Sequence, residues 1–128
     1  MAFMAFAPLG RGILSGQFHS VEDVPEGDRR HRDPRYQRGN IEHNVSIVEK
    51  LEEFAVEKGI SVATLALAWL INRKGPVIPI PSSKSRNHLE ENVAATDVEL
   101  SAEDLARIES ICPPGTAAGA SNMVSQKL

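Results

Sequence analysis

The chain has 128 residues, of which 41% are hydrophobic and 24% are charged, as is usual for one soluble globular domain with a sizeable core. Its formal net charge of −3 gives the whole molecule no electrostatic attraction to nucleic acid or to an anionic membrane, so neither is expected as a partner. A single cysteine, Cys112, excludes an internal disulfide and a cysteine-based metal site.

The sequence also argues against a membrane protein and against a metalloprotein. The longest unbroken apolar run, Leu65–Ile71, is too short to span a bilayer, and the first residues lack the basic region of a secretory signal. His19, His31 and His43 do not have metal-ligand spacing, so we expect no metal. A cytoplasmic protein is therefore expected.

A short strand and a long connection begin the chain. The apolar run Ala2–Phe6 predicts a buried strand, which Pro8 and the following glycines end. Residues 13–40 then show no hydrophobic period and contain the charged stretch DRRHRDPRYQR; connections of this length are usually functional or disordered. Its arginines could contact nucleic acid, but neighbouring acidic residues largely neutralise them, and we reject that hypothesis.

Two helices are predicted next. Apolar residues at helical spacing predict a helix over 41–55, and Gly59 follows its end. Ser61 is a suitable N-cap for a second helix, which runs to Arg73 and Lys74 and is apolar on nearly all sides, as in a buried helix. Gly75 and Pro76 then stop it.

The remaining elements are a strand and two more helices. Val77–Ile80 is typical of a parallel strand, Asn87–Ala95 can form a short helix, and a capping box at Ser101 precedes a helix with an apolar stripe. Residues 116–128 are small and polar and are expected to form a loose tail. Two strands separated by helices predict a parallel α/β pair joined by a crossover, and two strands are too few for a stable parallel sheet.

The residues after each strand are typical of an anion site. APLGRG follows the first strand, where glycines let the backbone approach a ligand closely. SSKS follows the second strand and begins a short helix, whose free N–H groups attract anions. The same serines could form only a turn and a helix N-cap, so this alternative stays open.

Three stretches, FAPLGRGILSG, LALAWLINRKGPVIPIPSSKSRNHLEEN and VELSAEDLARIESI, resemble the aldo-keto reductases, NADP-dependent enzymes on a (β/α)8 TIM barrel. The resemblance covers roughly residues 2–117. It implies an α/β fold class in which the chain is a partial barrel: the last two β/α units plus the C-terminal helix. The whole chain would then be a C-terminal fragment of an NADP-dependent oxidoreductase domain.

The resemblance also implies a set of cofactor-binding residues. After the first strand, Phe6 would lie against the nicotinamide ring, and Ala7 stands where the family commonly has a serine. Leu9, Gly10 and Arg11 would line the pyrophosphate.

The other half of this set follows the second strand. Ser83 and Lys84 match the pair that holds the 2′-phosphate, and Ser82 stands where the family often has Gly or Lys. The remaining residues implied by the resemblance are Ser85 and His88, beside the phosphate, and Glu91 and Asn92, at the adenine. A lysine and hydroxyls at a helix N-terminus favour NADP over NAD, for which a carboxylate would more typically face the ribose.

The catalytic residues of the resembling family are not matched. The family uses a Tyr, a Lys, an Asp and a His from the first half of the barrel, and the one tyrosine here, Tyr36, lies in no matching motif. NADP(H) and a small aldehyde or ketone are the expected partners if the barrel is completed. A non-catalytic cofactor- or partner-binding module and an inactive gene fragment remain alternatives. Self-association through open strand edges is also expected.

Overall fold

A computed structural model describes residues 1–120 of the chain. Its strands and α-helices are β1 (Phe3–Phe6), α1 (Asn40–Glu57), α2 (Val62–Ile71), β2 (Val77–Ile80), α3 (Arg86–Ala94) and α4 (Ala102–Ile111). Its short 3-10 helices are η1 (Gly10–Ser15), η2 (Val21–Asp23), η3 (Arg29–Arg32), η4 (Pro34–Tyr36) and η5 (Ala95–Asp97). The predicted order of strands and α-helices is confirmed, and the connection without a hydrophobic period folds into four of the short helices.

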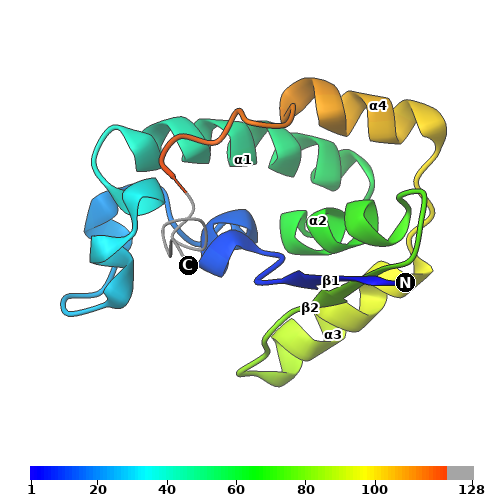
Figure 1. Ribbon diagram of the computed structural model, residues 1–128, viewed down its shortest axis with the longest axis horizontal. Coiled ribbons are helices and arrows are strands. Elements are labelled where there is room, and N and C mark those ends of the chain that lie inside the picture. The colour runs from blue at the N-terminus through cyan, green and yellow to red at the C-terminus, as the bar shows by residue number, and fades with distance from the viewer. Residues whose placement is uncertain (121–128) are drawn as a thin grey trace.

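The two strands form a parallel sheet, as predicted. Phe3 pairs with Val77 and Phe6 with Ile80, so the strands run in register and end together. The connection between them passes through α1 and α2, which is the crossover that a parallel pair requires. Figure 1 shows both arrows pointing the same way, with α2 between the sheet and α1.

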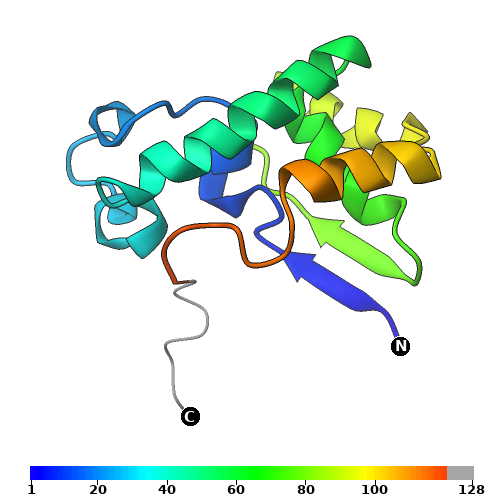
Figure 2. The same cartoon turned by 90° about the horizontal axis from the view of Figure 1, so that it is seen from above.

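Helix α2 lies at the centre of the core. It contacts β2 on one side and α1 on another, and α4 in turn packs on α1 (Figures 1 and 2). Leu65 and Ala68 are fully enclosed, which explains why this helix is apolar on nearly all sides. Phe54 of α1 is covered by the guanidinium of Arg107, 4.4 Å from its ring centroid, and Arg107 also forms two hydrogen bonds with Glu57.

Helix α2 is shorter than the sequence predicts, because Asn72 ends it. The Asn72 amide nitrogen donates to the carbonyl oxygens of Ala68 and Val98, both at 2.9 Å, and its oxygen accepts from the Leu100 N–H at 3.3 Å. These bonds tie the helix end to the segment before α4. Arg73 therefore lies beyond the helix rather than in its last turn.

The capping box of α4 is confirmed. Ser101 Oγ accepts from the Asp104 N–H, and the Asp104 carboxylate accepts from the Ser101 N–H, each at 3.0 Å. Lys58 Nζ lies 2.6 Å from the same carboxylate and, with the Ser101 N–H, lowers the pKa of Asp104. The N–H groups of Ser101 and Asp104 at the start of α4 are therefore satisfied. The Lys58 contact also ties α4 to the end of α1.

The segment after α4 lies against α1. Thr116 and Ala118, which the sequence analysis assigned to a loose tail over 116–128, form hydrogen bonds with His43 and Asn44 of α1. Residues 121–128 of that predicted tail lie outside the described residues. Among residues 1–120 no single helix is long and apolar enough to cross a bilayer; α1 and α2 reach that length and composition only together, across an 86° bend.

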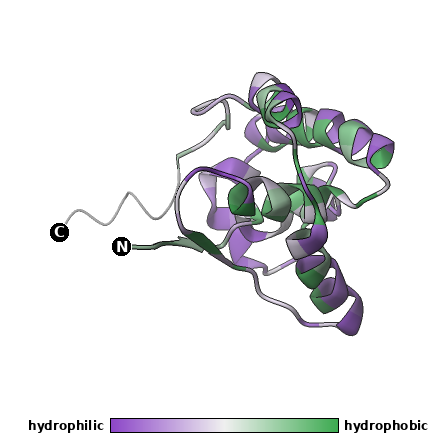
Figure 3. Ribbon diagram, turned by 90° about the vertical axis from the view of Figure 1, so that its right-hand side faces the viewer, coloured by the Kyte–Doolittle hydropathy of each residue, from purple (hydrophilic) through white to green (hydrophobic). Residues whose placement is uncertain are grey.

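One face of the sheet is open. Alternation along the strands places Met4 and Phe6 of β1 on the same face as Ile78 and Ile80 of β2. Their exposed fractions are 63%, 66%, 52% and 42%, whereas Ala5, on the face toward α2, is buried at 8%. Figure 3 shows the strand near the N-terminus in the colour of hydrophobic residues. An apolar face of this kind is usually covered by another layer of protein.

Candidate functional site

The register of the sheet brings the two predicted binding segments to one edge. Phe6 and Ile80 are paired and are the last residues of their strands. Residues 7–12 and residues 81–85 therefore both leave the sheet at its carboxyl end; in Figure 1 the first segment then turns toward α2 and the second runs down to α3. Ligands of parallel α/β proteins bind at this end of the strands.

The segment after β1 has an unusual backbone. Ala7, Gly10, Arg11 and Gly12 all have positive φ, at 48°, 58°, 60° and 106°. Glycine is favoured at position 12, because residues with a side chain rarely adopt its φ of 106° and an added Cβ would lie 3.0 Å from the ring of Phe18. A non-glycine residue in the left-handed region is unfavourable by about 1–2 kcal/mol, so Ala7 and Arg11 need support from their surroundings.

Contacts from a distant loop provide that support for Arg11. Its guanidinium Nη1 lies 2.9 Å from the carboxylate of Asp33, which is itself buried. Its carbonyl oxygen accepts from Arg30 Nε at 2.8 Å and from the Tyr36 hydroxyl at 3.1 Å. The side chain predicted to line a pyrophosphate is therefore held in an ion pair, with part of it still exposed.

Tyr36 is a structural residue in this arrangement. Its side chain is 1% exposed, its ring meets Phe18 edge to face, and its hydroxyl donates to the carbonyl oxygens of Gly10 or Arg11. Burial raises the pKa of Tyr36 to about 12. A tyrosine that acts as a general acid needs access to the reacting oxygen and a pKa near the working pH. Tyr36 has neither property.

The segment after β2 is exposed and carries hydroxyls and a cation. Ser85 is the N-cap of α3, because its Oγ accepts from the His88 N–H at 3.2 Å. Ser83 Oγ donates to the Ser85 carbonyl at 2.8 Å. Residues 82–90 are all exposed, and within the described part of the chain Lys84 forms no ion pair. The Lys84 ammonium is thus available to an anion.

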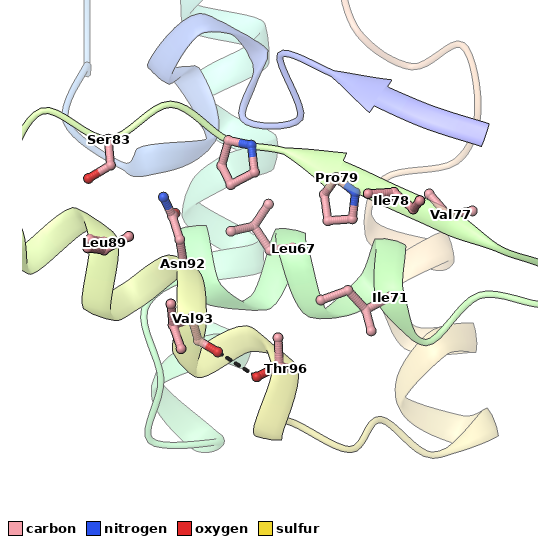
Figure 4. Close-up of a pocket in the computed structure, with 11 residues that line it drawn as sticks. Leu67, Ile71, Val77, Ile78, Pro79, Ser83, Leu89, Asn92, Val93 and Thr96 are labelled. Carbon is pink, nitrogen blue, oxygen red and sulfur yellow. Dashed lines mark hydrogen bonds between the residues drawn. The ribbon is translucent and has the colours of Figure 1, made fainter. Parts of the chain in front are cut away.

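The predicted adenine residues lie further along α3. Glu91 is half-buried, and its carbonyl accepts from Thr64 Oγ1 of α2 at 3.1 Å. Asn92 and Ser83 line the polar end of an open groove between α2, β2 and α3 (Figure 4). The groove has a volume of about 450 Å³ and is otherwise lined by apolar side chains and Thr96: Leu67, Ile71, Val77, Ile78, Pro79, Pro81, Leu89 and Val93.

Sequence reasoning missed the residues that hold the turn after β1. Arg30, Asp33 and Tyr36 belong to the connection that shows no hydrophobic period, and nothing in their spacing relates them to Arg11. A local signal was present in the DPRY stretch. Asp33 is the N-cap of η4, where it accepts from the Arg35 N–H at 3.1 Å, and aspartate before proline is typical of such a start.

Comparisons with known proteins identify the family of the chain. A sequence model of the aldo/keto reductase family matches residues 1–113. Aldo-keto reductase yakc (NADP(+)) of Schizosaccharomyces pombe is 39% identical over 120 residues, which are 94% of this chain and 35% of the relative. Probable aldo-keto reductase 1 of Glycine max is 35% identical over 119 residues, 93% of this chain and 34% of the relative.

Solved structures show the same relationship. A glycerol dehydrogenase, AKR11B4, of Gluconobacter oxydans superposes with a TM-score of 0.76 at 25% identity, over 86% of this chain and 33% of its own. The thermostable aldo-keto reductase Tm1743, solved with the inhibitor epalrestat, gives a TM-score of 0.57 at 25% identity, over 87% of this chain and 30% of its own. These neighbours are TIM barrels. The chain belongs to the aldo/keto reductase family and spans about a third of the length of the relatives it matches.

Proposed function

We propose that the chain forms the NADP(H)-binding C-terminal part of an aldo-keto reductase that reduces a small aldehyde or ketone. The observation that carries the proposal is that residues 7–12 and 82–85 follow two paired strands that end together at the carboxyl end of the sheet. A dinucleotide that crosses this edge would have its pyrophosphate at the first segment and its 2′-phosphate at the second. The name of the S. pombe relative includes NADP(+), which supports this choice of cofactor.

The 2′-phosphate side is argued from charge. Ser83 and Lys84 precede α3, a helix of nine residues whose N-terminus carries partial positive charge. The exposed Lys84 ammonium, an adjacent hydroxyl and this helix end together would stabilise a group with nearly two negative charges. Arg86 lies in the first turn of the same helix and adds to the positive potential, with His88 two residues further on. Ser85 contributes indirectly, because its hydroxyl caps the helix.

The other contacts follow the resemblance. Phe6 would pack on the nicotinamide ring, and its exposure on the open sheet face leaves its ring free to do so. Leu9, Gly10 and Arg11 would face the pyrophosphate. Glu91 and the groove residue Asn92 would hold the adenine, and Ala7 and Ser82 would lie beside the pyrophosphate and the 2′-phosphate, respectively.

A bound NADPH would supply a hydride to the carbonyl carbon, and the carbonyl oxygen would then need a proton. Tyr36 does not supply this proton, since its hydroxyl is buried and bonded to backbone carbonyls. We propose that the proton donor belongs to other strands of the barrel. The role of this chain would be to bind and orient the cofactor.

The cofactor choice is tested by calorimetric titration of the 128-residue chain with NADPH and with NADH. We expect NADPH to bind more tightly, and Lys84→Glu to weaken NADPH binding at least tenfold while it changes NADH binding little. Lys74→Glu is the matched control, because it makes the same charge change in the turn before β2, at the opposite end of the strand. Equal affinities for the two cofactors, unchanged by Lys84→Glu, would contradict the proposal.

A further inference from the structure

The backbone of Arg11 is held by two donors from a loop far along the chain. Arg30 Nε and the Tyr36 hydroxyl both bond its carbonyl oxygen, at 2.8 Å and 3.1 Å, from 19 and 25 residues away. Tyr36 also lies 3.3 Å from the carbonyl oxygen of Gly10. Because one hydroxyl carries one proton, Tyr36 shares its bond between two neighbouring carbonyl groups.

Each of these donors is itself fixed in place. Arg30 lies 5.0 Å over the ring of Phe18 and forms an ion pair with Asp28 at 2.7 Å. Tyr36 meets the same Phe18 ring at an interplanar angle of 88° and is enclosed from water. Burial raises the pKa of Tyr36 to about 12, so its hydroxyl remains a donor at any physiological pH. The loop therefore presents two rigid donors to one turn of backbone.

The direction of these bonds has a consequence for anions. In a planar trans peptide the N–H points opposite to the C=O of the same unit. The carbonyl groups of Gly10 and Arg11 point toward the loop, so the N–H groups of Arg11 and Gly12 point away from it. The Gly12 N–H is taken up within the turn by the Leu9 carbonyl at 3.0 Å, so an anion approaching from that other side meets the Arg11 N–H rather than the negative ends of the Gly10 and Arg11 carbonyl dipoles.

We propose that Tyr36 and Arg30 are positioning residues for the pyrophosphate of a bound dinucleotide: they hold the Leu9–Gly12 turn with its carbonyl groups directed away from the phosphates. The inference rests on the proposed function, because it needs a dinucleotide at this edge of the sheet. It adds to that function two residues that would never touch the ligand. Their effect would be confined to the part of the ligand that meets the turn.

The test compares two ligands that differ in the pyrophosphate. NADPH contains it, whereas adenosine 2′-monophosphate has the adenine, ribose and 2′-phosphate without it. Calorimetric titration of the full 128-residue chain should show that Tyr36→Phe and Arg30→Gln each weaken NADPH binding roughly tenfold. Each substitution removes a hydrogen bond that holds the turn, and a tenfold loss of affinity is about the free energy of one such bond. Binding of adenosine 2′-monophosphate should stay within twofold of wild type.

A control variant and a folding check separate positioning from simple stability. Arg38→Gln removes a guanidinium from the same connection, where its one ion pair among residues 1–120 is with Glu22, and should change neither affinity. Far-UV circular dichroism establishes that each variant is folded. Should Tyr36→Phe fail to fold, Arg30→Gln carries the test alone, since the Arg30 side chain is partly exposed.

Three outcomes would contradict the proposal in different ways. If the variants bind NADPH and adenosine 2′-monophosphate equally less tightly than wild type, Tyr36 and Arg30 are structural residues and the inference is wrong. The inference is also wrong if both variants bind both ligands with wild-type affinity. If the wild-type chain binds neither ligand, the proposed function falls first and the inference falls with it.

Discussion

Asn44 and Ala118 form a reciprocal pair of hydrogen bonds across 74 residues of sequence. The Ala118 N–H donates to Asn44 Oδ1 at 2.7 Å, and Asn44 Nδ2 donates to the Ala118 carbonyl at 3.0 Å. The same Nδ2 lies 3.1 Å from the Arg35 carbonyl in η4. One buried amide therefore joins α1, the loop that supports the Arg11 turn, and the segment after α4.

Removal of this amide should loosen both segments. Asn44→Ala leaves the half-buried carbonyl groups of Arg35 and Ala118 and the Ala118 N–H without their partner, so we expect the free energy of unfolding to fall by about 1–3 kcal/mol. Amide hydrogen exchange at residues 116–119 should rise by a larger factor than exchange in α2. Ser46→Ala is the control, because its exposed hydroxyl donates to the nearby His43 carbonyl within α1 and links no other segment of the described chain. Unchanged exchange at residues 116–119 would show that Asn44 does not anchor them.

The buried phenol of Tyr36 predicts a pH dependence at alkaline pH. Burial raises its pKa in the folded state from 10.0 to about 12, so the folded chain holds this proton more tightly than the unfolded chain does. Its contribution to stability is complete below pH 10 and is lost as the pH rises toward 12. The full shift corresponds to roughly 2–3 kcal/mol. Denaturant unfolding at pH 8 and pH 11 should show a loss of stability that is smaller in Tyr36→Phe than in wild type.

The open sheet face predicts self-association. Met4, Phe6, Ile78 and Ile80 form one exposed apolar face between two unpaired strand edges. We expect sedimentation velocity of the purified chain to show a mass that rises with concentration, and Met4→Lys to reduce that rise. Val56→Lys is the control, since Val56 is 71% exposed on α1, away from the sheet. A monodisperse monomer with a sharp two-state melt would contradict the prediction.

Much of the fold follows from local patterns. Hydrophobic spacing and caps predict the α-helices and both strands, because each of these signals lies within a few residues. The end of α2 is not predicted: Asn72 stops the helix through Val98 and Leu100, which are distant in sequence. The 3-10 helices of the long connection likewise depend on buried contacts between Phe18, Tyr36 and the turn after β1.

For the site, the resemblance to the aldo-keto reductases indicated the residues that would contact a cofactor. The parallel pairing of β1 and β2 explains why residues 7–12 and 81–85 begin at the same end of the sheet. The supporting residues required the structure. Arg30 and Tyr36 donate hydrogen bonds to a backbone carbonyl of Arg11. Every residue has a backbone carbonyl, so such a contact does not require a particular residue type at the acceptor position. No sequence pattern therefore marks it.

Turnover is predicted to be absent from the isolated chain. Its single tyrosine is buried and hydrogen-bonded to backbone carbonyls. Hydride transfer to a carbonyl would form an alkoxide that this tyrosine could not protonate. We expect no NADPH consumption with an aldehyde above the rate of a heat-denatured sample. Turnover that survives in Tyr36→Phe would point to another proton donor within these residues. Binding without turnover would also fit the alternative of a non-catalytic cofactor-binding module.

The central claim, that the two strand ends form one cofactor site, is tested most directly by amide chemical shifts. In a titration of isotope-labelled chain with NADPH, residues 6–12 and residues 82–92 should shift together, with one apparent affinity. Adenosine 2′-monophosphate should shift mainly the second group. Shifts confined to one segment, two separate affinities, or changes centred on other elements would contradict the claim.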